Sequence, residues 1–411
     1  MSRVKRKKLF LSAISSGLIA ILILLTFLVN PQNDLNSPQI AKKVVDSPQS
    51  SLEWDDHKAA LNVTDLEKVD ILVLDFPSDY KNSDFFAQTQ FLTVAVRGDS
   101  TAVAQRIKEM RGFRDVFLFS ERAESDYFEI KKDEDIYLMP RSALRQNGHV
   151  FHPKNFTVVS RLWTFGKKVN CLNISMNRTE KDSVHKISPK DVVLLAKLRD
   201  LIIEQGAISF LFSGTLLGWY RECSIIPHTK DMDIAIFHDE FPFDFPFLVL
   251  NLSLPWLSLD HLYGRPNDNY ISNFRMKGET KFNIDIFAMY YDEKRNQSFI
   301  TGLNMLKKMR YSYPRLEKIC TADLLNFVFH VPCDPAIYLS AEYGLRWRED
   351  WPTGKYNWLS SPKNKEDNGK FLQSEKKEII RTFPESKAMK ENRENKGKEA
   401  PARRFIWEGF P

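Results

Sequence analysis

Two aspartates inside an apolar run constrain the fold of this chain more than any other feature of its sequence. The stretch DMDIAIF places Asp231 and Asp233 one residue apart. Alternate side chains of a β-strand share a face, so both carboxylates should point one way while Met232, Ile234 and Ile236 face a core. A carboxylate taken out of water is costly unless it is paired or bound to a metal. The pattern therefore predicts a strand whose polar face has a function.

A turn of small residues precedes this strand. Ser213, Gly214 and Thr215 follow the apolar run AISFLF and open a second helix. Backbone N–H groups at a glycine turn that begins a helix bind phosphate well, and glycine lets the phosphate approach closely. Arg221 and Lys230, which lie between this turn and the aspartates, are candidates to hold phosphate oxygens. The alternatives are a structural ion pair for Arg221 and a solvated loop charge for Lys230.

A third carboxylate stands in a similar setting. Asp285 lies between Ile284 and Ile286 in the strand-like stretch KFNIDIFAMY. Carboxylates from two adjacent strands can hold one or two divalent ions, and all-oxygen ligands suit Mg²⁺ or Mn²⁺. Such ions would neutralise charge on the phosphates of a bound nucleotide and on the leaving group. We therefore expect Asp231, Asp233 and Asp285 to be both the metal ligands and the catalytic residues.

The order of these elements is more specific than any one of them, because a lone D-x-D pair or S-G-T turn is common by chance. An apolar strand, a glycine turn, a helix, a D-x-D strand and a third strand with one aspartate are together the order expected of a nucleotidyltransferase-type metal site. The predicted fold class is α/β (α+β), with a nucleotidyltransferase-like mixed sheet and flanking helices. A smaller α/β domain and a single N-terminal transmembrane helix are expected to precede it.

The amino terminus predicts a membrane anchor. Residues 9–29 contain no charge and are long enough to span a hydrocarbon core of roughly 30 Å. Residues 1–8 contain five basic side chains, which should stay cytoplasmic. A cleaved signal peptide is the alternative, but the apolar run exceeds its usual length and no small-x-small site follows. We expect a single-pass type II protein with a lumenal body.

The rest of the chain divides by composition. Residues 30–58 are polar and contain several prolines, as expected of a stem. Residues 59–165 contain the strand-like runs VDILVLDF, FLTVAVRG, DVFLFSER and DIYLMP and the helical stretch TAVAQRIKEMR, and predict an α/β domain without a phosphate-loop or dinucleotide glycine pattern. Residues 166–362 hold the acidic constellation, with a helix expected over 188–204. Residues 363–411 are expected to form a charged tail, too polar to bury itself.

Composition and cysteine usage restrict the partners and the cellular compartment that the chain can be expected to have. The chain is 43% hydrophobic, and its net charge of +6 arises without a basic-aromatic stripe, so a nucleic-acid partner is not expected. Six N-x-S/T sequons agree with a secretory lumen. Four cysteines without a CxxC pair argue against a structural zinc site, while disulfides and buried free thiols both remain open. The histidines His228 and His330 are expected to be packed or surface residues rather than ligands.

The stretch FSGTLLGWYRECSIIPHTKDMDI resembles the signature of the LicD-like group, in which G-T-x-L-G-x-x-R is followed by I-P and D-x-D. The later stretches PCDPAIYLSAEYG and WPTGKYNW, and the short N-terminal anchor, resemble the fukutin family of phospho-alcohol transferases within that group. The resemblance covers residues 185–360. It implies a Golgi type II membrane enzyme of protein O-linked mannosylation that transfers ribitol 5-phosphate from CDP-ribitol to a glycan hydroxyl on dystroglycan. Bacterial relatives transfer phosphocholine from CDP-choline instead.

The same resemblance assigns roles within the predicted site. It implies that the three aspartates are the metal carboxylates, that Gly214 and Thr215 form the phosphate turn, and that Arg221 lies near the donor diphosphate. Many bacterial members have further acids directly before the D-x-D pair, where this chain has Thr229 and Lys230. The number of bound ions is therefore left open. Expected partners are the CDP-alcohol donor, the glycan acceptor, the membrane and other Golgi glycosyltransferases.

Three functions compete on these observations. The first is metal-dependent transfer of a CDP-linked alcohol phosphate, either ribitol phosphate or a phosphocholine-type group. The second is a catalytically silent lumenal scaffold for glycosyltransferases, against which the presence of all three carboxylates counts. The third is synthesis of a CDP-alcohol from CTP, against which a lumenal location counts. The nucleotide that is consumed distinguishes them.

Overall fold

The computed structural model describes residues 69–75, 92–98, 113–351 and 355–396, with isolated positions between 101 and 108. All of these lie in one compact unit, residues 63–411. Within the described part, no helix has the length and apolar character needed to cross a membrane. The predicted anchor at 9–29 and stem at 30–58 lie outside the described residues.

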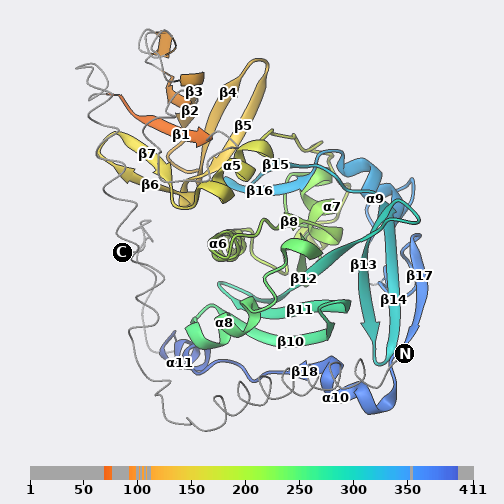
Figure 1. Cartoon of the computed structure of the whole chain (residues 1–411). Helices are drawn as coiled ribbons and strands as arrows, with labels where there is room; N and C mark the ends of the chain where they lie inside the picture. The colour runs from red at the N-terminus through yellow and green to blue at the C-terminus, as the bar shows by residue number, and fades with distance from the viewer. Residues whose placement is uncertain are drawn as a thin grey trace, which may run out of the picture. The chain divides into compact units, whose positions relative to one another are not determined.

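The first sheet has seven strands in the order β5-β4-β3-β2-β1-β7-β6 (Figure 1). It is mixed, because β1 pairs in parallel with β7 and β2 with β3 while the other neighbours are antiparallel. Helix α5 (Phe156–Thr164) packs on it, and the Asn155 side chain caps this helix by accepting a bond from the Val158 N–H at 3.2 Å. The strands are β1 Ile71–Asp75, β2 Leu92–Arg97, β3 Phe113–Glu121, β4 Tyr127–Lys132, β5 Asp135–Pro140, β6 Leu144–Asn147 and β7 Val150–Pro153.

The four strands predicted from alternating apolar runs in this region are confirmed as β1, β2, β3 and β5. The described residues of the predicted helix TAVAQRIKEMR are helical. Strands β4, β6 and β7 were not predicted, because their side chains alternate weakly or include several polar residues. Backbone pairing with stronger neighbours forms them despite that weak pattern.

The second sheet has eleven strands and contains both predicted acidic strands. Its main path is β15-β16-β8-β9-β12-β11-β10-β18, and β12 also pairs with β13, which continues to β14 and β17. The strands are β8 Phe210–Leu211, β9 Asp231–Phe237, β10 Leu257–Arg265, β11 Asp268–Lys277, β12 Lys281–Asp292, β13 Gln297–Asn304, β14 Lys307–Pro314, β15 Ile319–Leu324, β16 Phe327–Pro332, β17 Lys365–Lys370 and β18 Ile380–Thr382.

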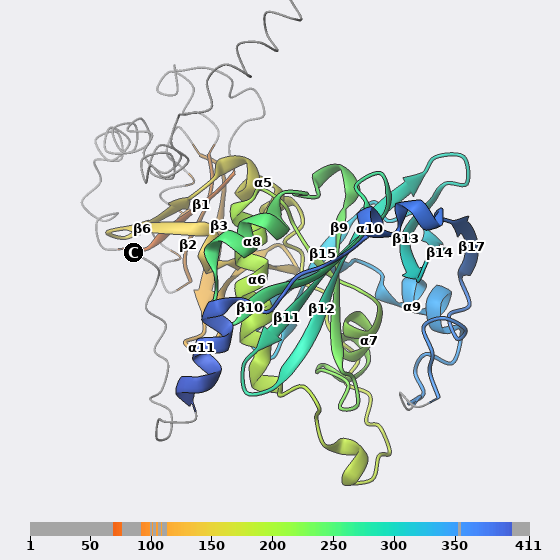
Figure 2. The same ribbon diagram turned by 90° about the horizontal axis from the view of Figure 1, so that it is seen from below.

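Helices lie on both sides of the strands β9 to β12, with α6 and α8 on one side and α7 on the other (Figure 2). The predicted helix over 188–204 is present as a 3-10 turn, Pro189–Asp191, followed by α6. Gly206, just beyond its end, has φ +83°, which only glycine adopts easily. The helices are α6 Val192–Glu204, α7 Ser213–Glu222, α8 Phe245–Leu252, α9 Pro335–Tyr343, α10 Lys376–Ile379 and α11 Lys387–Lys396.

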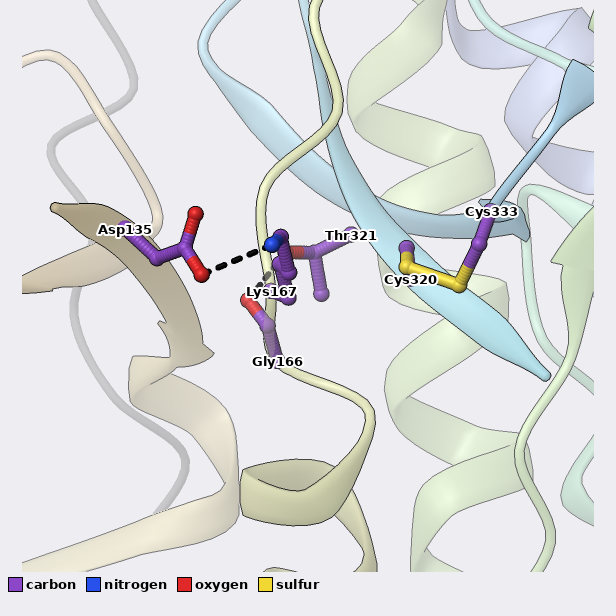
Figure 3. Close-up of a disulfide and its surroundings, with 6 residues drawn as sticks. All are labelled: Asp135, Gly166, Lys167, Cys320, Thr321 and Cys333. Atoms are coloured by element: carbon purple, nitrogen blue, oxygen red, sulfur yellow. Dashed lines mark hydrogen bonds and ion pairs between the residues drawn. A yellow bond between two sulfur atoms is a disulfide. The ribbon is translucent and has the colours of Figure 1, made fainter. Parts of the chain in front are cut away.

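Residues 166–169 connect the two sheets by pairing with both. Leu138 of β5 donates to the Gly166 carbonyl at 2.8 Å, and the Thr321 hydroxyl of β15 donates to the same carbonyl at 2.5 Å. Lys167 forms an ion pair with Asp135 at 2.7 Å (Figure 3). The predicted boundary between residues 165 and 166 thus falls at a segment that is hydrogen-bonded on both sides.

The four cysteines form two disulfides, which resolves the alternatives left open by the sequence. Cys320–Cys333 joins the start of β15 to the residue after β16 (Figure 3). Cys171–Cys223 ties the chain after the connecting segment to the end of α7. The second bridge encloses a loop of 52 residues, and cross-linking a loop of this size stabilises a fold mainly by restricting the unfolded chain.

The segment predicted as a charged tail contributes to the second sheet in its described part. β17 pairs with β14, and β18 pairs with the outer side of β10. Phe371, Ile379 and Met389 are buried, so a few apolar side chains anchor an otherwise polar stretch. Sparse anchors of this kind leave little signal in a composition dominated by charge.

Burial of His330 on β16 predicts that acid destabilises the fold. Its side chain is 1% exposed, and neither ring nitrogen has a hydrogen-bond partner among the residues that the structure describes. Burial together with Arg199 and Arg161 lowers its pKa to about 3. As the pH falls, His330 is protonated in the unfolded chain before it is protonated in the folded chain. The contribution of the buried, neutral imidazole to the free energy of unfolding is therefore fully present above the ordinary histidine pKa of about 6.5 and is lost as the pH falls below it. Between pH 7 and pH 5 this group alone should reduce the free energy of unfolding by about 2 kcal/mol.

Urea unfolding of the wild type and of His330→Leu at both pH values measures this loss. The variant should lose about 2 kcal/mol less than the wild type on acidification. His149→Leu, which removes a half-exposed imidazole whose Nδ1 contacts the Asp70 carboxylate at 2.8 Å, is the control for loss of a histidine and should not lessen the acid loss. Equal acid losses in the wild type and His330→Leu would contradict the prediction.

Candidate active site

The structure brings the three predicted aspartates onto one face of two neighbouring strands. β9 and β12 pair in parallel, with Asp233 opposite Asp285 and Asp231 opposite Asn283. Residues that are opposite in a parallel pair point to the same face, so the carboxylates lie side by side. The prediction that two adjacent strands supply them is confirmed, while their roles as ligands stay predictions.

The opposite face of the same strands is core, as the alternation predicted. Met232, Ile234 and Ile236 of β9 are at most 2% exposed, and Ile284 and Ile286 of β12 are fully buried. In contrast, Asp231 is exposed and Asp233 and Asp285 are half-buried. Apolar packing on one face therefore fixes the strands, and the carboxylates on the other face remain accessible from solvent.

The turn at the start of α7 holds Asp233 in place. The Gly214 N–H donates to the Asp233 carboxylate at 3.1 Å, and the Asp233 N–H donates to the Thr215 hydroxyl at 2.7 Å. The Phe212 N–H donates to the Asp233 carbonyl at 3.1 Å. A Cβ on residue 214 would lie 3.2 Å from this carboxylate, so glycine is needed for close approach. The turn was predicted to bind phosphate; the observed partner of its groups is Asp233, and the phosphate role stays a prediction.

A fourth carboxylate, Glu342 of α9, lies beneath this turn and was not among the predicted site residues. The Ser213 hydroxyl donates to it at 2.7 Å and the Tyr313 hydroxyl at 2.8 Å, with Tyr356 at 3.5 Å. Ser213 has φ +43°, an unusual conformation for a residue with a side chain, and this bond helps to hold it. The sequence feature that could have identified Glu342 is its place as the one acid in the apolar stretch AIYLSAEYG, because a buried acid needs hydrogen-bond partners.

Asn273 of β11 is a second residue that was missed. It lies opposite Asp285, is 6% exposed, and its amide donates to the Asp285 carboxylate at 2.7 Å. A polar residue within the buried strand YISNFRM was the sequence signal. The amide orients Asp285 without neutralising its charge.

The carboxylates concentrate negative charge that no basic side chain balances directly. Within the described residues, none of the three aspartates forms an ion pair with a lysine or arginine. Burial raises the pKa of Asp233 well above its usual value, and Asp231, Asp285 and Glu342 add to the rise. Burial likewise raises the pKa of Asp285 to about 6, against the Asn273 hydrogen bond and with help from Asp231 and Asp260. Like charges this close favour a cation or a proton between them.

This donor set fits a hard divalent cation in its chemistry. All the donors are oxygens, and the excess negative charge is what such a cation relieves. In the described part of the chain, however, no three acidic, imidazole or thiol groups already stand at the spacing of a finished metal cage. Asp231, at the exposed start of β9, is the member with most freedom to adjust, since among the described residues only the Thr229 hydroxyl hydrogen-bonds to its carboxylate, at 3.3 Å.

Arg221 is engaged in structural contacts rather than presented to this site. It is 1% exposed and donates to the Glu222 carboxylate at 2.9 Å and to the Glu349 carbonyl at 2.8 Å. It lies seven residues after Gly214 on α7, about 10 Å along the helix axis. These contacts agree with the alternative interpretation of Arg221 as a member of a structural ion pair. None of them directs the guanidinium toward the aspartates. Lys230, in contrast, is exposed and directly precedes Asp231.

The mixed sheet with its acidic face is the fold of a nucleotidyltransferase-type domain, and residues 206–334 match the nucleotidyltransferase domain of the LicD/FKTN/FKRP family. An uncharacterized protein of Caenorhabditis elegans is 31% identical over 351 residues, which are 77% of this chain and 92% of that protein. The ribitol-5-phosphate transferase FKTN of Mus musculus is 34% identical over 196 residues, and that of Homo sapiens is 31% identical over 207. The chain therefore belongs to the LicD family as a fukutin-like member.

The similarity to the ribitol-5-phosphate transferases covers only part of each chain. The match covers 47% of this chain and 40% of the mouse transferase, so less than half of either is aligned. A second uncharacterized Caenorhabditis elegans protein is 35% identical over 235 residues, 56% of this chain and 60% of that protein. All three predicted aspartates lie within the family domain, whereas Glu342 lies just beyond it.

Proposed function

We propose that this chain transfers ribitol 5-phosphate from CDP-ribitol to a hydroxyl of a glycan on a glycoprotein such as dystroglycan, with release of CMP. The observation that supports this most is the group of three carboxylates on adjacent strands, which have no basic partner within the described ranges and lie beside the turn that holds Asp233. Family membership supports phospho-alcohol transfer, and the names of the mammalian relatives suggest ribitol phosphate as the group.

In the proposed reaction the acceptor hydroxyl oxygen forms a bond to the phosphorus of the ribitol phosphate. The bond between that phosphorus and the oxygen of CMP breaks, CMP leaves, and the hydroxyl proton is released. Asp231, Asp233 and Asp285 would hold Mg²⁺ or Mn²⁺, which supplies positive charge against the donor diphosphate. The chain's own contribution is to fix Asp233 through Gly214 and Thr215 and to orient Asp285 through Asn273.

The proposed setting is the Golgi membrane, with a type II anchor at residues 9–29 and the catalytic body in the lumen. The sequons and the anchor pattern in the sequence support this location. Two disulfides support an oxidising compartment. Immunolocalisation of the tagged full chain, with protease protection of its C-terminal side in intact vesicles, tests it.

CMP release from CDP-ribitol by the purified full chain tests the proposed reaction. With a dystroglycan glycopeptide as acceptor, we expect release with Mn²⁺ or Mg²⁺ and at least a hundredfold less with excess EDTA, because the carboxylates alone repel the diphosphate. CDP-choline and CTP are the comparison nucleotides. Preferred use of CDP-choline would show that the transferred group is phosphocholine and not ribitol phosphate. Use of CTP would favour synthesis of a CDP-alcohol. Consumption of none of these nucleotides would favour the scaffold function.

A further inference from the structure

A cavity of about 420 Å³ opens where β9 and β12 begin. Its wall includes four cationic side chains, which come from the loop before β9 and from the facing ends of β11 and β12. One acid, Glu385, also lines it, from the segment after β18. The cations are Lys230, Arg275, Lys277 and Lys281.

Strand register places these cations next to the carboxylates in successive rows. Asn273 is opposite Asp285, Arg275 is opposite Asn283, and Lys277 is opposite Lys281. Residues two apart share a face, and two residues span about 7 Å of a strand. Arg275 is therefore one row, and the Lys277–Lys281 pair two rows, beyond the row of Asp233 and Asp285. The polar face changes from acidic to basic within about 14 Å.

Two of the cations have no carboxylate partner in the described part of the chain. Lys230 and Lys281 are exposed, and neither forms an ion pair within the described residues. Arg275 is paired with Asp260, which directs its guanidinium from one side. With Glu385 as the one acid on the wall, the cavity is positively charged overall. The positive charge of this wall also has a purely structural explanation, because lysines at this distance from the aspartates offset their negative charge.

We propose that this cavity is a substrate subsite that binds a phosphate group through Lys230 and Lys281. The proposal rests on the proposed transfer function, because a phosphate at this subsite would lie next to the carboxylates. Ammonium groups form short, charge-assisted hydrogen bonds with phosphate oxygens, and Asn283 adds an amide on the same wall. The phosphate belongs either to the nucleotide donor or to a phosphorylated sugar of the acceptor; both present the same chemistry to the lysines.

Binding measurements on the purified full chain test the subsite without any turnover. CDP represents the donor and glucose 6-phosphate represents a phosphorylated sugar, each titrated by calorimetry with Mg²⁺ and again with EDTA. The variant is Lys230→Gln/Lys281→Gln. The control is Lys294→Gln/Lys318→Gln, which removes the same charge from two exposed positions outside the cavity.

We expect the cavity variant to weaken binding of at least one probe about tenfold while the control stays within twofold of the wild type. Weakening of CDP alone assigns the subsite to the donor, and weakening of glucose 6-phosphate alone assigns it to the acceptor. Equal affinities of the two double variants for both probes would overturn the proposal and leave the lysines as counter-charges of the aspartates. Because no CMP release is measured, failure of the proposed reaction would appear separately, as an inactive wild type that still binds.

Discussion

Asp233→Asn should reduce CMP release from CDP-ribitol by at least about a thousandfold without unfolding the protein. The substitution removes one charge from the centre of the carboxylate group and keeps the size of the side chain. An amide oxygen can still accept the Gly214 N–H, and the Asp233 backbone bonds to Thr215 and Phe212 are unaffected. Removal of a repelled charge should leave the thermal midpoint unchanged or slightly higher, since burial and neighbouring acids raise the pKa of Asp233.

The matched control is Asp239→Asn, on the 3-10 turn His238–Glu240 after the same strand. Its side chain is 84% exposed and contacts only His238 among the described residues. This variant should keep wild-type activity and stability. If Asp233→Asn instead unfolded the chain, the carboxylate would have a structural role; if it remained active, the proposed site would be wrong.

Glu342→Ala should lower both stability and transfer. The substitution removes the acceptor of the buried Tyr313 hydroxyl and of the half-buried Ser213 hydroxyl, which keeps only the Tyr343 hydroxyl at 3.3 Å among the described residues. A buried polar group that loses its partner costs about 1–3 kcal/mol. We expect the free energy of unfolding to fall by about 3 kcal/mol. Without this bond Ser213 can leave its φ of +43°, which moves the Gly214 N–H away from Asp233. Transfer measured well below the melting temperature should fall about a hundredfold.

Glu342→Gln separates these two effects. Its amide keeps the volume and one acceptor oxygen but turns a donor toward hydroxyls that also donate, so we expect a smaller loss of stability and an intermediate rate. Glu349→Ala, which removes a half-exposed carboxylate paired with Arg346, should change neither property. Wild-type transfer by folded Glu342→Ala would show that the turn holds Asp233 without help from α9.

The acidic site was predictable because two local signals coincide. Alternation in DMDIAIF and NIDIF fixes both the strand and the face of each aspartate, and strands with an apolar face can pack only one way round. The turn at the start of α7 was also predictable from its small residues. Its observed partner was not, because the contact between Gly214 and Asp233 depends on how β8 and β9 pair.

Other parts of the site depend on contacts between residues far apart in the sequence. Glu342 reaches Ser213 across 129 residues, and Asn273 reaches Asp285 only through strand register. Arg221 fitted a pattern for phosphate binding, but its partners at Glu349 and Trp347 lie on a later loop. Periodicity identifies which face a side chain occupies and does not identify what the rest of the chain places above it.

The edge strand β18 and the segment that leads from it into α11 have a consequence for any shortened version of this protein. Deletion from residue 380 onward would leave the outer backbone groups of β10 unpaired, and an open edge of that length invites pairing with another molecule. It would also remove Glu385 and Met389, two side chains of the cavity wall, and leave the basic end of the sheet open to solvent. A truncation designed from the high charge of this region would therefore favour aggregation and disturb the chemistry at the same time.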